Sequence, residues 1–278
     1  MWDFRTITPL QRPEELADKE FLTEEEAANL EQETIDRNEH LLHQAARRTS
    51  AGGNIGAYNN FWMDRGTNVV GNRRTSLIVD PPNGRIPPLT PEGQQRVDAR
   101  AEARDRPAVS WEDRSLFERC VTRGLPRLPG GYNQNLQILQ TPDHVVILYE
   151  MMREVRVIPL DGQPHLEDNV RLWHGDSRGR WEDETLVVET TNVSPKAHFR
   201  GSGDGLHLIE RFTRIDADTV DHQVTIKDPT TFTEPWTASI PLRATQDQMY
   251  EYACHEGNYS MESTLSGARA IEKRAQAE

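Results

Sequence analysis

Residues 206–227 read LHLIERFTRIDADTVDHQVTIK, and this stretch decides the fold. Apolar and polar side chains alternate with a period of two on both sides of Asp216-Ala217-Asp218, which is typical of two β-strands joined by a turn. The side chains of the first strand divide between two faces: His207, Ile209, Arg211 and Thr213 on one, and Leu208, Glu210 and Phe212 on the other. One face of such a strand is expected to be buried.

Similar short segments follow one another from Gln134 onward. The predicted strands are Asn135–Gln140, His144–Met151, Glu154–Leu160, Arg171–Trp173, Thr185–Thr191, Leu206–Ile215, Thr219–Lys227, Thr237–Leu242 and Met249–Ala253. Turn residues such as Pro142-Asp143 and Asp161-Gly162 separate many of them. Eight or nine closely linked strands predict a mainly β fold, an antiparallel lipocalin-like β-barrel over residues 132–278.

Residues 1–131 are expected to form a helical and irregular region that packs on the barrel. Thr23 and Glu26 have the spacing of a capping box and predict a helix that runs to about Arg48. Thr90-Pro91 predicts the start of a second helix, which ends near Arg106. A strand over Arg74–Asp80 and a short helix over Ser115–Val121 are also predicted.

The net charge of the chain argues against a nucleic-acid partner. The 278 residues carry a formal net charge of −13, whereas nucleic-acid binding needs clustered Lys and Arg. No stretch approaches the roughly 20 apolar residues that span a bilayer, so we expect no membrane insertion. The start Met1-Trp2-Asp3-Phe4 is not that of a signal peptide, and we expect a leader to be absent from this chain.

Two cysteines, Cys120 and Cys254, lie far apart in the sequence. They lack the CxxC spacing of a zinc knuckle or a thioredoxin-like site. They are either two buried free thiols or one disulfide. A disulfide closing so long a loop would contribute on the order of 4–5 kcal/mol in the chain-entropy model and would require an oxidising compartment.

Four blocks of sequence carry a family resemblance. They are WDFR (2–5), RTSLIVDPP (74–82), GDSRGRWE (175–182) and YEYACHEGNY (250–259). Together they resemble a large family of uncharacterised exported proteins of environmental Gram-negative bacteria, over nearly the whole chain. The resemblance implies a periplasmic or secreted protein and therefore favours the Cys120–Cys254 disulfide. The family brings no established activity and no catalytic assignment.

The first candidate site is the segment 174–182, which we expect to be a loop between two strands. It holds an imidazole, a carboxylate, guanidinium groups and an indole, and loops on a rigid sheet often carry function. Asp176 and Arg178 are the candidate catalytic groups here, and Trp181 is a candidate for substrate contact. The alternative is a hairpin turn in which Asp176 caps the backbone and Arg178 forms a surface ion pair worth less than ~1 kcal/mol.

The second candidate site centres on Glu210, with Glu150 and Glu189 as similar cases. Each carboxylate is flanked by apolar residues, as expected for an acid held inside a barrel. Burial raises the pKa of a carboxyl and tunes it for proton transfer, whereas a neighbouring Arg lowers that pKa again. The alternative is a cross-strand salt bridge between Glu210 and an Arg on the next strand.

The third candidate site is His255-Glu256 beside Cys254, with Tyr252 nearby. A disulfide would fix both side chains in place, which suits a catalytic pair. The alternative is a polar rim around a structural disulfide.

The sequence gives no sign of a cofactor. Five imidazoles of the predicted strand region are candidate metal ligands, namely His174, His198, His207, His222 and His255. Their number suffices for a three-His metal site, but none has the His-x-His or His-x-x-x-His spacing that brings two ligands together. A P-loop motif is also missing from the sequence, and we expect neither a cofactor nor a bound metal.

These observations lead to the hypothesis of an extracytoplasmic, cofactor-independent acid–base enzyme, a lyase, isomerase or hydrolase, acting on a small molecule in a barrel pocket. Glu210 or His255 would be the base, His207 the acid, and Arg178 or Arg211 the oxyanion stabiliser. Trp181, Tyr252, Glu150 and Glu189 would contact the substrate.

The main alternative is a non-catalytic, lipocalin-like binding protein with an apolar cup. An enzyme predicts paired His and carboxylate groups in its pocket, whereas a binding cup predicts few charges. A third hypothesis, an interaction module, predicts an exposed aromatic patch over Tyr58–Met63. A homo-oligomer is compatible with each of the three.

Overall fold

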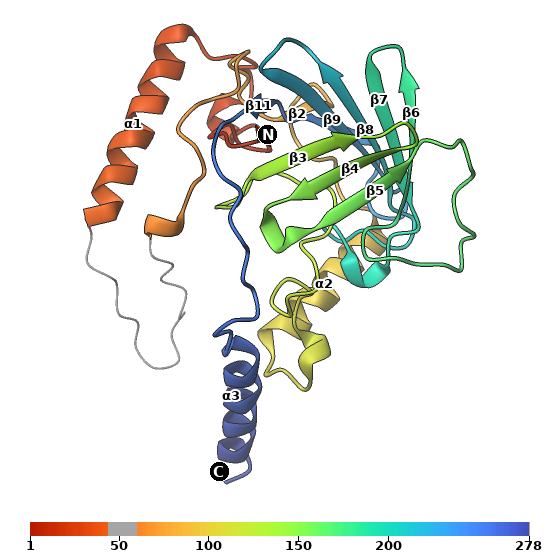
Figure 1. The fold of residues 1–278 in the computed structure, drawn as a ribbon. Helices are drawn as coiled ribbons and strands as arrows, with labels where there is room; N and C mark the ends of the chain where they lie inside the picture. The colour runs from red at the N-terminus through yellow and green to blue at the C-terminus, as the bar shows by residue number, and fades with distance from the viewer. Residues whose placement is uncertain (44–59, 278) are drawn as a thin grey trace.

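A computed structural model describes residues 1–43 and 60–277 of the chain. Within these residues, eleven strands form one sheet, and three α-helices lie outside it (Figure 1). The strands are β1 (Trp2–Asp3), β2 (Ile78–Asp80), β3 (Asn135–Gln140), β4 (His144–Tyr149), β5 (Val155–Pro159), β6 (Asp176–Glu182), β7 (Thr185–Thr191), β8 (His207–Arg214), β9 (Thr219–Lys227), β10 (Trp236–Ser239) and β11 (Leu242–Ala244). The α-helices are α1 (Glu24–His43), α2 (Pro91–Asp105) and α3 (Ser260–Ala275).

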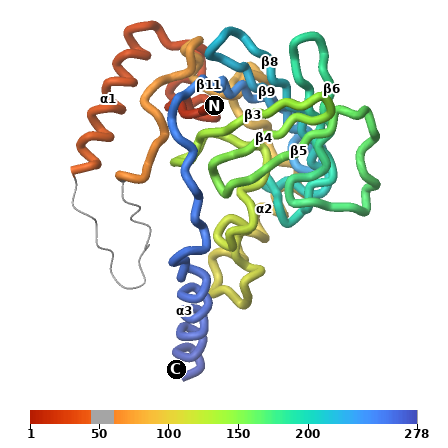
Figure 2. The backbone as a smooth tube through the Cα atoms, in the orientation of Figure 1, coloured from red at the N-terminus to blue at the C-terminus, as the bar shows by residue number. Residues whose placement is uncertain are grey.

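Nine of the strands form a nearly closed antiparallel barrel in the order β5-β4-β3-β1-β11-β9-β8-β7-β6. This confirms the mainly β, lipocalin-like barrel. β10 pairs with β9 and with β2, off this path. β1 lies between β3 and β11 and joins the two halves of the wall (Figure 2). The N-terminal residues thus supply two strands, and strands of two or three residues are too short to show a period of two.

The barrel closes where β5 approaches β6. Within the described chain no ladder pairs these two strands. A Cβ atom on Gly179 of β6 would lie 2.7 Å from Leu160 Cδ2 and 2.8 Å from Ile158 Cγ2. The missing side chain therefore allows the end of β5 to pack directly against β6.

The barrel interior is mainly apolar. Strands all around the barrel contribute fully or almost fully buried side chains, including Ile147, Ile158, Val188, Leu208, Ile226 and Trp236. Burial of each such side chain contributes roughly 1.5–3 kcal/mol relative to exposure. Trp236 also contacts the rings of Phe199 and Phe232, at centroid distances of 6.0 and 5.9 Å.

Both predicted helix starts are present. Thr23 Oγ1 accepts the Glu26 N–H at 3.2 Å, and the Glu26 carboxylate accepts the Thr23 N–H at 2.8 Å, which completes the capping box. Thr90 caps α2 by accepting the Gly93 N–H at 3.0 Å. The predicted extension of the first helix to Arg48 lies outside the described residues. None of the described helices combines the length and the apolar character that a bilayer crossing requires.

Three predicted elements are wrong. Residues 171–173 make only an isolated bridge, between Leu172 and Val193, before the chain turns at Gly175 with φ +65°. Residues 249–253 pair with no strand in the described part of the chain. Residues 115–121 form turns instead of a helix, and the left-handed conformation of Cys120, with φ +55°, is incompatible with helix continuation. Helix α3 was not predicted.

Candidate functional site

The first polar cluster lies inside the barrel, on the face of β8 that the alternation predicts. Leu208, Glu210 and Phe212 are buried, whereas His207 and Arg211 lie on the opposite, partly exposed face. Glu210 has no exposed surface. An ionised carboxylate in this position needs both a counter-charge and hydrogen bonds.

Arg156 of β5 supplies the counter-charge. Its Nη2 donates to Glu210 Oε2 at 2.6 Å. The same nitrogen lies 3.1 Å from Ser177 Oγ and 3.2 Å from Thr190 Oγ1, and Nη1 lies 3.5 Å from the Tyr149 hydroxyl. These contacts join β5 to β6, β7 and β8 across the interior, and so they strengthen the seam that lacks ladder hydrogen bonds.

His222 of β9 contacts the other oxygen of Glu210. Its Nε2 lies 3.2 Å from Glu210 Oε1, and its ring stacks on Phe212 at a centroid distance of 4.2 Å. Burial favours the neutral carboxyl, but the charge of Arg156 and the hydrogen bond from His222 outweigh it and lower the pKa of Glu210 to about 2. Glu210 is therefore a fully paired anion.

A second polar cluster lies at the end of the barrel where β4 ends and β5 and β6 begin. Arg127 and Glu154 form a buried ion pair there. His174 Nε2 lies 3.3 Å from Glu154 Oε2 and 2.8 Å from Thr122 Oγ1. Burial, and after it the charges of two nearby arginines, lower the pKa of His174 to about 4. The His174 ring is consequently neutral at pH 7.

A cleft of about 1080 Å³ lies next to this second cluster, and Thr122 is part of its lining. Its walls are α2, residues 112–124 and residues 195–201, and Figure 1 shows α2 below the barrel. Apolar side chains line much of it: Ile86, Leu89, Val97, Leu116, Phe117 and Phe232. Its size is close to that of known small-molecule sites, which are about 300–1,000 Å³.

Arginines from all three walls share the cleft lining. There are six of them, and Arg104 and Arg114 pair with Asp105 and Glu118. The other four are Arg100 of α2, Arg119 and Arg123 of residues 112–124, and Arg200 of residues 195–201. In the described part of the chain, none of these four has a carboxylate within 4.0 Å of its guanidinium nitrogens. This contrasts with Arg156 and Arg127, each of which faces a buried carboxylate.

The four arginines are held by weaker contacts. The guanidinium of Arg119 lies 4.2 Å from the centroid of the Trp111 ring, and that of Arg123 lies 4.8 Å from the Phe117 centroid. Arg100 Nη2 approaches two backbone carbonyl oxygens at 3.4 and 3.5 Å. Its Nη1 is buried and has no hydrogen-bond acceptor among the described residues.

A second, smaller hollow of about 730 Å³ lies between α1 and residues 6–10. Thr34, Leu41 and Leu128 contribute to its lining, and Arg200 borders both hollows. Two side chains of the predicted aromatic patch, Phe61, which lines this hollow, and Trp62, are 68% and 63% exposed. Tyr58 lies outside the described residues.

Two of the proposed catalytic residues lie on the outer face of the barrel. His207 Nε2 is 3.4 Å from Glu189, and Arg211 Nη1 is 2.8 Å from Glu182. Glu189, expected inside the barrel, is on this outer face instead and also pairs with Arg180 at 2.6 Å. The structure therefore does not bring His207 or Arg211 to Glu210.

The segment 174–182 is a strand for most of its length instead of a loop. Arg178 Nε donates to Asp176 at 3.1 Å, and Asp176 also accepts from His165 and from the Leu166 N–H, each at 3.0 Å. This is the capping and ion-pair arrangement of the alternative interpretation. Trp181, near the opposite end of β6, is 48% exposed.

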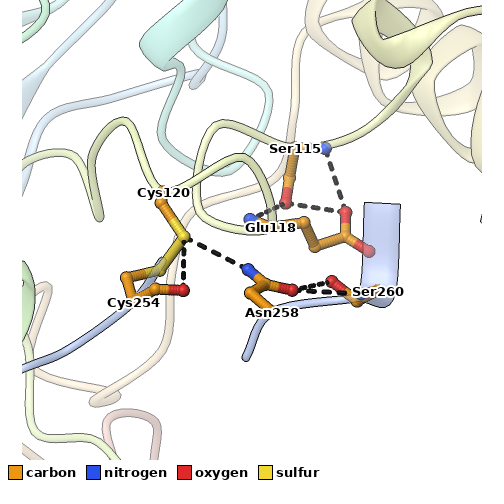
Figure 3. The surroundings of a disulfide bond; sticks show 6 residues. All are labelled: Ser115, Glu118, Cys120, Cys254, Asn258 and Ser260. Atoms are coloured by element: carbon orange, nitrogen blue, oxygen red, sulfur yellow. Dashed lines mark hydrogen bonds between the residues drawn. A yellow bond between two sulfur atoms is a disulfide. The ribbon is translucent and has the colours of Figure 1, made fainter. Parts of the chain in front are cut away.

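The third candidate site contains the disulfide between Cys120 and Cys254, which is confirmed (Figure 3). It joins the 112–124 wall of the cleft to the segment before α3. Asn258 donates to Cys120 Sγ at 3.3 Å, and its Oδ1 accepts the Ser260 N–H at the start of α3. His255 is exposed beside this bridge.

Tyr252 and Glu150 have contacts that anchor the chain. Tyr252 stacks on Tyr132 at a centroid distance of 6.4 Å. Glu150 is buried and accepts the N–H groups of Asn135 and Tyr250, at 3.2 and 3.0 Å. Glu150 thus fixes the C-terminal segment to the edge of the barrel.

The five imidazoles do not gather at one place. His222 lies inside the barrel, His174 at its end and His207 on its outer face. Within the residues that the structure describes, no group of three or more His, Cys, Asp or Glu side chains is placed to hold a metal ion.

Sequence reasoning missed Arg156, the contact of His222 with Glu210, and the cleft arginines. The alternation on β9 does place His222 with Val220 and Val224, and this signal was available. The sequence around Arg156 gave the opposite signal, because an arginine between two valines predicts that the valines face inward. In the structure Val155 and Val157 are 50% and 56% exposed, and the arginine is buried. Arg100 lies on a helix with few apolar residues, which pointed to full exposure.

Comparisons with protein-family models, with curated proteins and with solved structures find no match to this chain. A functional interpretation therefore has to rest on the cleft and the two polar clusters themselves.

Proposed function

We propose that the protein binds a small organic molecule in the cleft at the end of its barrel. The observation that carries the proposal is the cleft of about 1080 Å³, lined by apolar side chains and by four arginines that have no carboxylate partner among the described residues. The barrel interior supports it, because the acid–base groups there are already paired with one another. The cleft lining includes His198 but, among the described residues, no carboxylate within ion-pair distance of it.

Ligand binding is tested by calorimetry and thermal-shift screening against a metabolite panel, with a variant that fills the cleft. Ala101 of α2 lines the cleft, whereas Ala99 of the same helix is exposed and outside it. We expect Ala101→Trp to abolish the binding of each hit and Ala99→Trp to leave it unchanged. Equal affinity of both variants for every hit, or a panel with no hit, would contradict the proposal.

A second candidate function, the acid–base enzyme, is favoured by one specific contact. Thr122 lines the cleft, and its hydroxyl lies 2.8 Å from the Nε2 of His174. A neutral imidazole beside the cleft is a proton acceptor at pH 7. Turnover of a bound hit that His174→Gln abolishes without loss of affinity would establish a lyase, isomerase or hydrolase. Binding of a hit without its turnover would favour a non-catalytic binding protein over an enzyme.

The proposal includes a periplasmic or secreted location. The Cys120–Cys254 disulfide supports it, because such bonds persist in oxidising compartments. Thiol alkylation of the protein in cell fractions tests this location. We expect the protein in the periplasmic or culture fraction, with both cysteines unreactive until reduction. A cytoplasmic protein with two reactive thiols would contradict it.

A further inference from the structure

The cleft carries a charge opposite to that of the chain. Seven Arg or Lys side chains and three Asp or Glu side chains line it, whereas the whole chain has a net charge of −13. All three acids are already engaged, Glu118 by Arg114, Glu112 by Lys196 at 3.3 Å and Asp113 by Arg106 at 2.9 Å. A concentration of positive charge in a low-dielectric cleft attracts anions.

The uncompensated charge is spread over every wall. Arg100, Arg123 and Arg200 come from three different segments, and none has a carboxylate partner in the described chain. Desolvation of the His198 ring, and after it the charge of Arg100, lower the pKa of His198 to about 4. Partial desolvation also lowers the pKa of Arg200 and of Arg100. An anion in the cleft would stabilise the charged form of each of these groups.

From this arrangement we infer that the ligand is an organic anion, with one carboxylate or sulfonate group on an apolar body. The inference rests on the proposed binding function. The guanidinium groups of Arg100, Arg123 and Arg200 would hold the anionic group, because their planar donors match paired oxygens. Leu116, Phe117 and Phe232 would contact the apolar body.

Two probes with the same ring system, one charged and one neutral, separate the effect of the ligand's charge from that of its apolar part. 8-Anilinonaphthalene-1-sulfonate carries a sulfonate, and N-phenyl-1-naphthylamine is the same ring system without it. We expect fluorescence titration to show the anionic probe binding about tenfold more tightly or better, as one charge-assisted hydrogen bond in a desolvated site predicts. High salt should reduce the difference in affinity between the two probes, because it screens the charge of the sulfonate.

Variants of the exposed Arg123 and Arg200 link this preference to the cleft without threatening the fold. We expect Arg123→Gln and Arg200→Gln each to weaken binding of the sulfonate about fivefold or more and to leave the neutral probe unchanged. Arg180→Gln is the matched control, since it removes the same charge from the outer face of the barrel. It should change neither probe.

The outcomes separate the inference from the function on which it rests. Equal affinity for both probes, with binding lost in Ala101→Trp, would overturn the anion preference and leave the binding function intact. Binding of neither probe, together with an unproductive metabolite panel, would overturn both. An equal effect of Arg180→Gln and Arg123→Gln would also contradict the inference, because it would show a long-range charge effect in place of a cleft contact.

Discussion

The barrel interior contains a buried arginine, and the cleft below it contains half-buried and exposed ones. The two regions differ in how that charge is compensated. In the interior, Arg156 faces Glu210 at 2.6 Å, and hydroxyl groups fill most of its remaining contacts. In the cleft, Arg123 faces the Phe117 ring and Arg100 faces backbone carbonyls. One nitrogen of Arg100 has no acceptor among the described residues. Internally compensated charge serves the fold, whereas charge without an internal partner is available to a ligand.

The largest predicted effect comes from breaking the interior pair. Arg156→Met leaves the Glu210 carboxylate buried without its counter-charge, and it should lower the free energy of unfolding by about 3–5 kcal/mol. Urea denaturation measures this loss. The double variant Arg156→Met/Glu210→Leu should recover much of it, because no buried charge remains. A loss below ~1 kcal/mol in the single variant would mean that the pair is not structural.

Removal of the disulfide should have the next largest effect. The double variant Cys120→Ala/Cys254→Ala opens a loop with a sequence separation of 134, and we expect a loss of about 2–5 kcal/mol by the same denaturation assay. Because Cys120 lies in the 112–124 wall, probe affinity should fall as well. Unchanged probe affinity in the folded variant would show that this wall keeps its shape without the bridge.

Acid should destabilise the protein in two steps. The pKa of His174 in the folded protein is about 4, below its ordinary value of 6.5, so the unfolded chain takes up this proton first. Stability is therefore complete above pH 6.5 and falls toward pH 4, by on the order of 2–3 kcal/mol. The pKa of Glu210, about 2 against 4.5, gives a second fall between pH 4.5 and 2.

Unfolding free energies of the wild type and His174→Gln, measured from pH 7.5 to 3, test this order. The His174→Gln variant should lose little stability between pH 6.5 and 4, and its stability should still begin to fall below pH 4.5. His198, whose pKa is also about 4, titrates in the same window and should leave a remainder. Identical profiles for both proteins would show that His174 titrates with its ordinary pKa.

The smallest effect is expected in the cleft. Arg123→Gln removes a charge that has no internal partner, so the free energy of unfolding should change by less than about 0.5 kcal/mol. Arg180→Gln breaks an exposed pair with Glu189 and should cost at most about 1 kcal/mol. A stability loss of several kcal/mol in Arg123→Gln would place that arginine in the fold instead of in a ligand site.

Much of the barrel was predictable because strand periodicity is a local signal. The alternation over 206–215 correctly separated Glu210 from His207, and Thr23 and Thr90 marked two helix starts. The predicted strand at 249–253 failed because pairing depends on a partner, which a local pattern does not reveal. β1 was missed because two residues are too few to show a period.

The candidate site was much less predictable, since it depends on contacts between distant segments. Arg156 is buried between two exposed valines, and its burial is stabilised by the ion pair with Glu210 on another strand. The cleft joins α2, residues 112–124 and residues 195–201, and no single one of these segments has a distinctive motif. The charged and seemingly solvent-facing character of α2 even pointed away from a binding role.

The most direct test of the account is a crystal structure of the protein grown with 8-anilinonaphthalene-1-sulfonate. The account predicts the probe between α2 and residues 112–124, with sulfonate oxygens about 3 Å from guanidinium nitrogens of the cleft. A probe seated inside the barrel beside Glu210, or only in the hollow under α1, would contradict it.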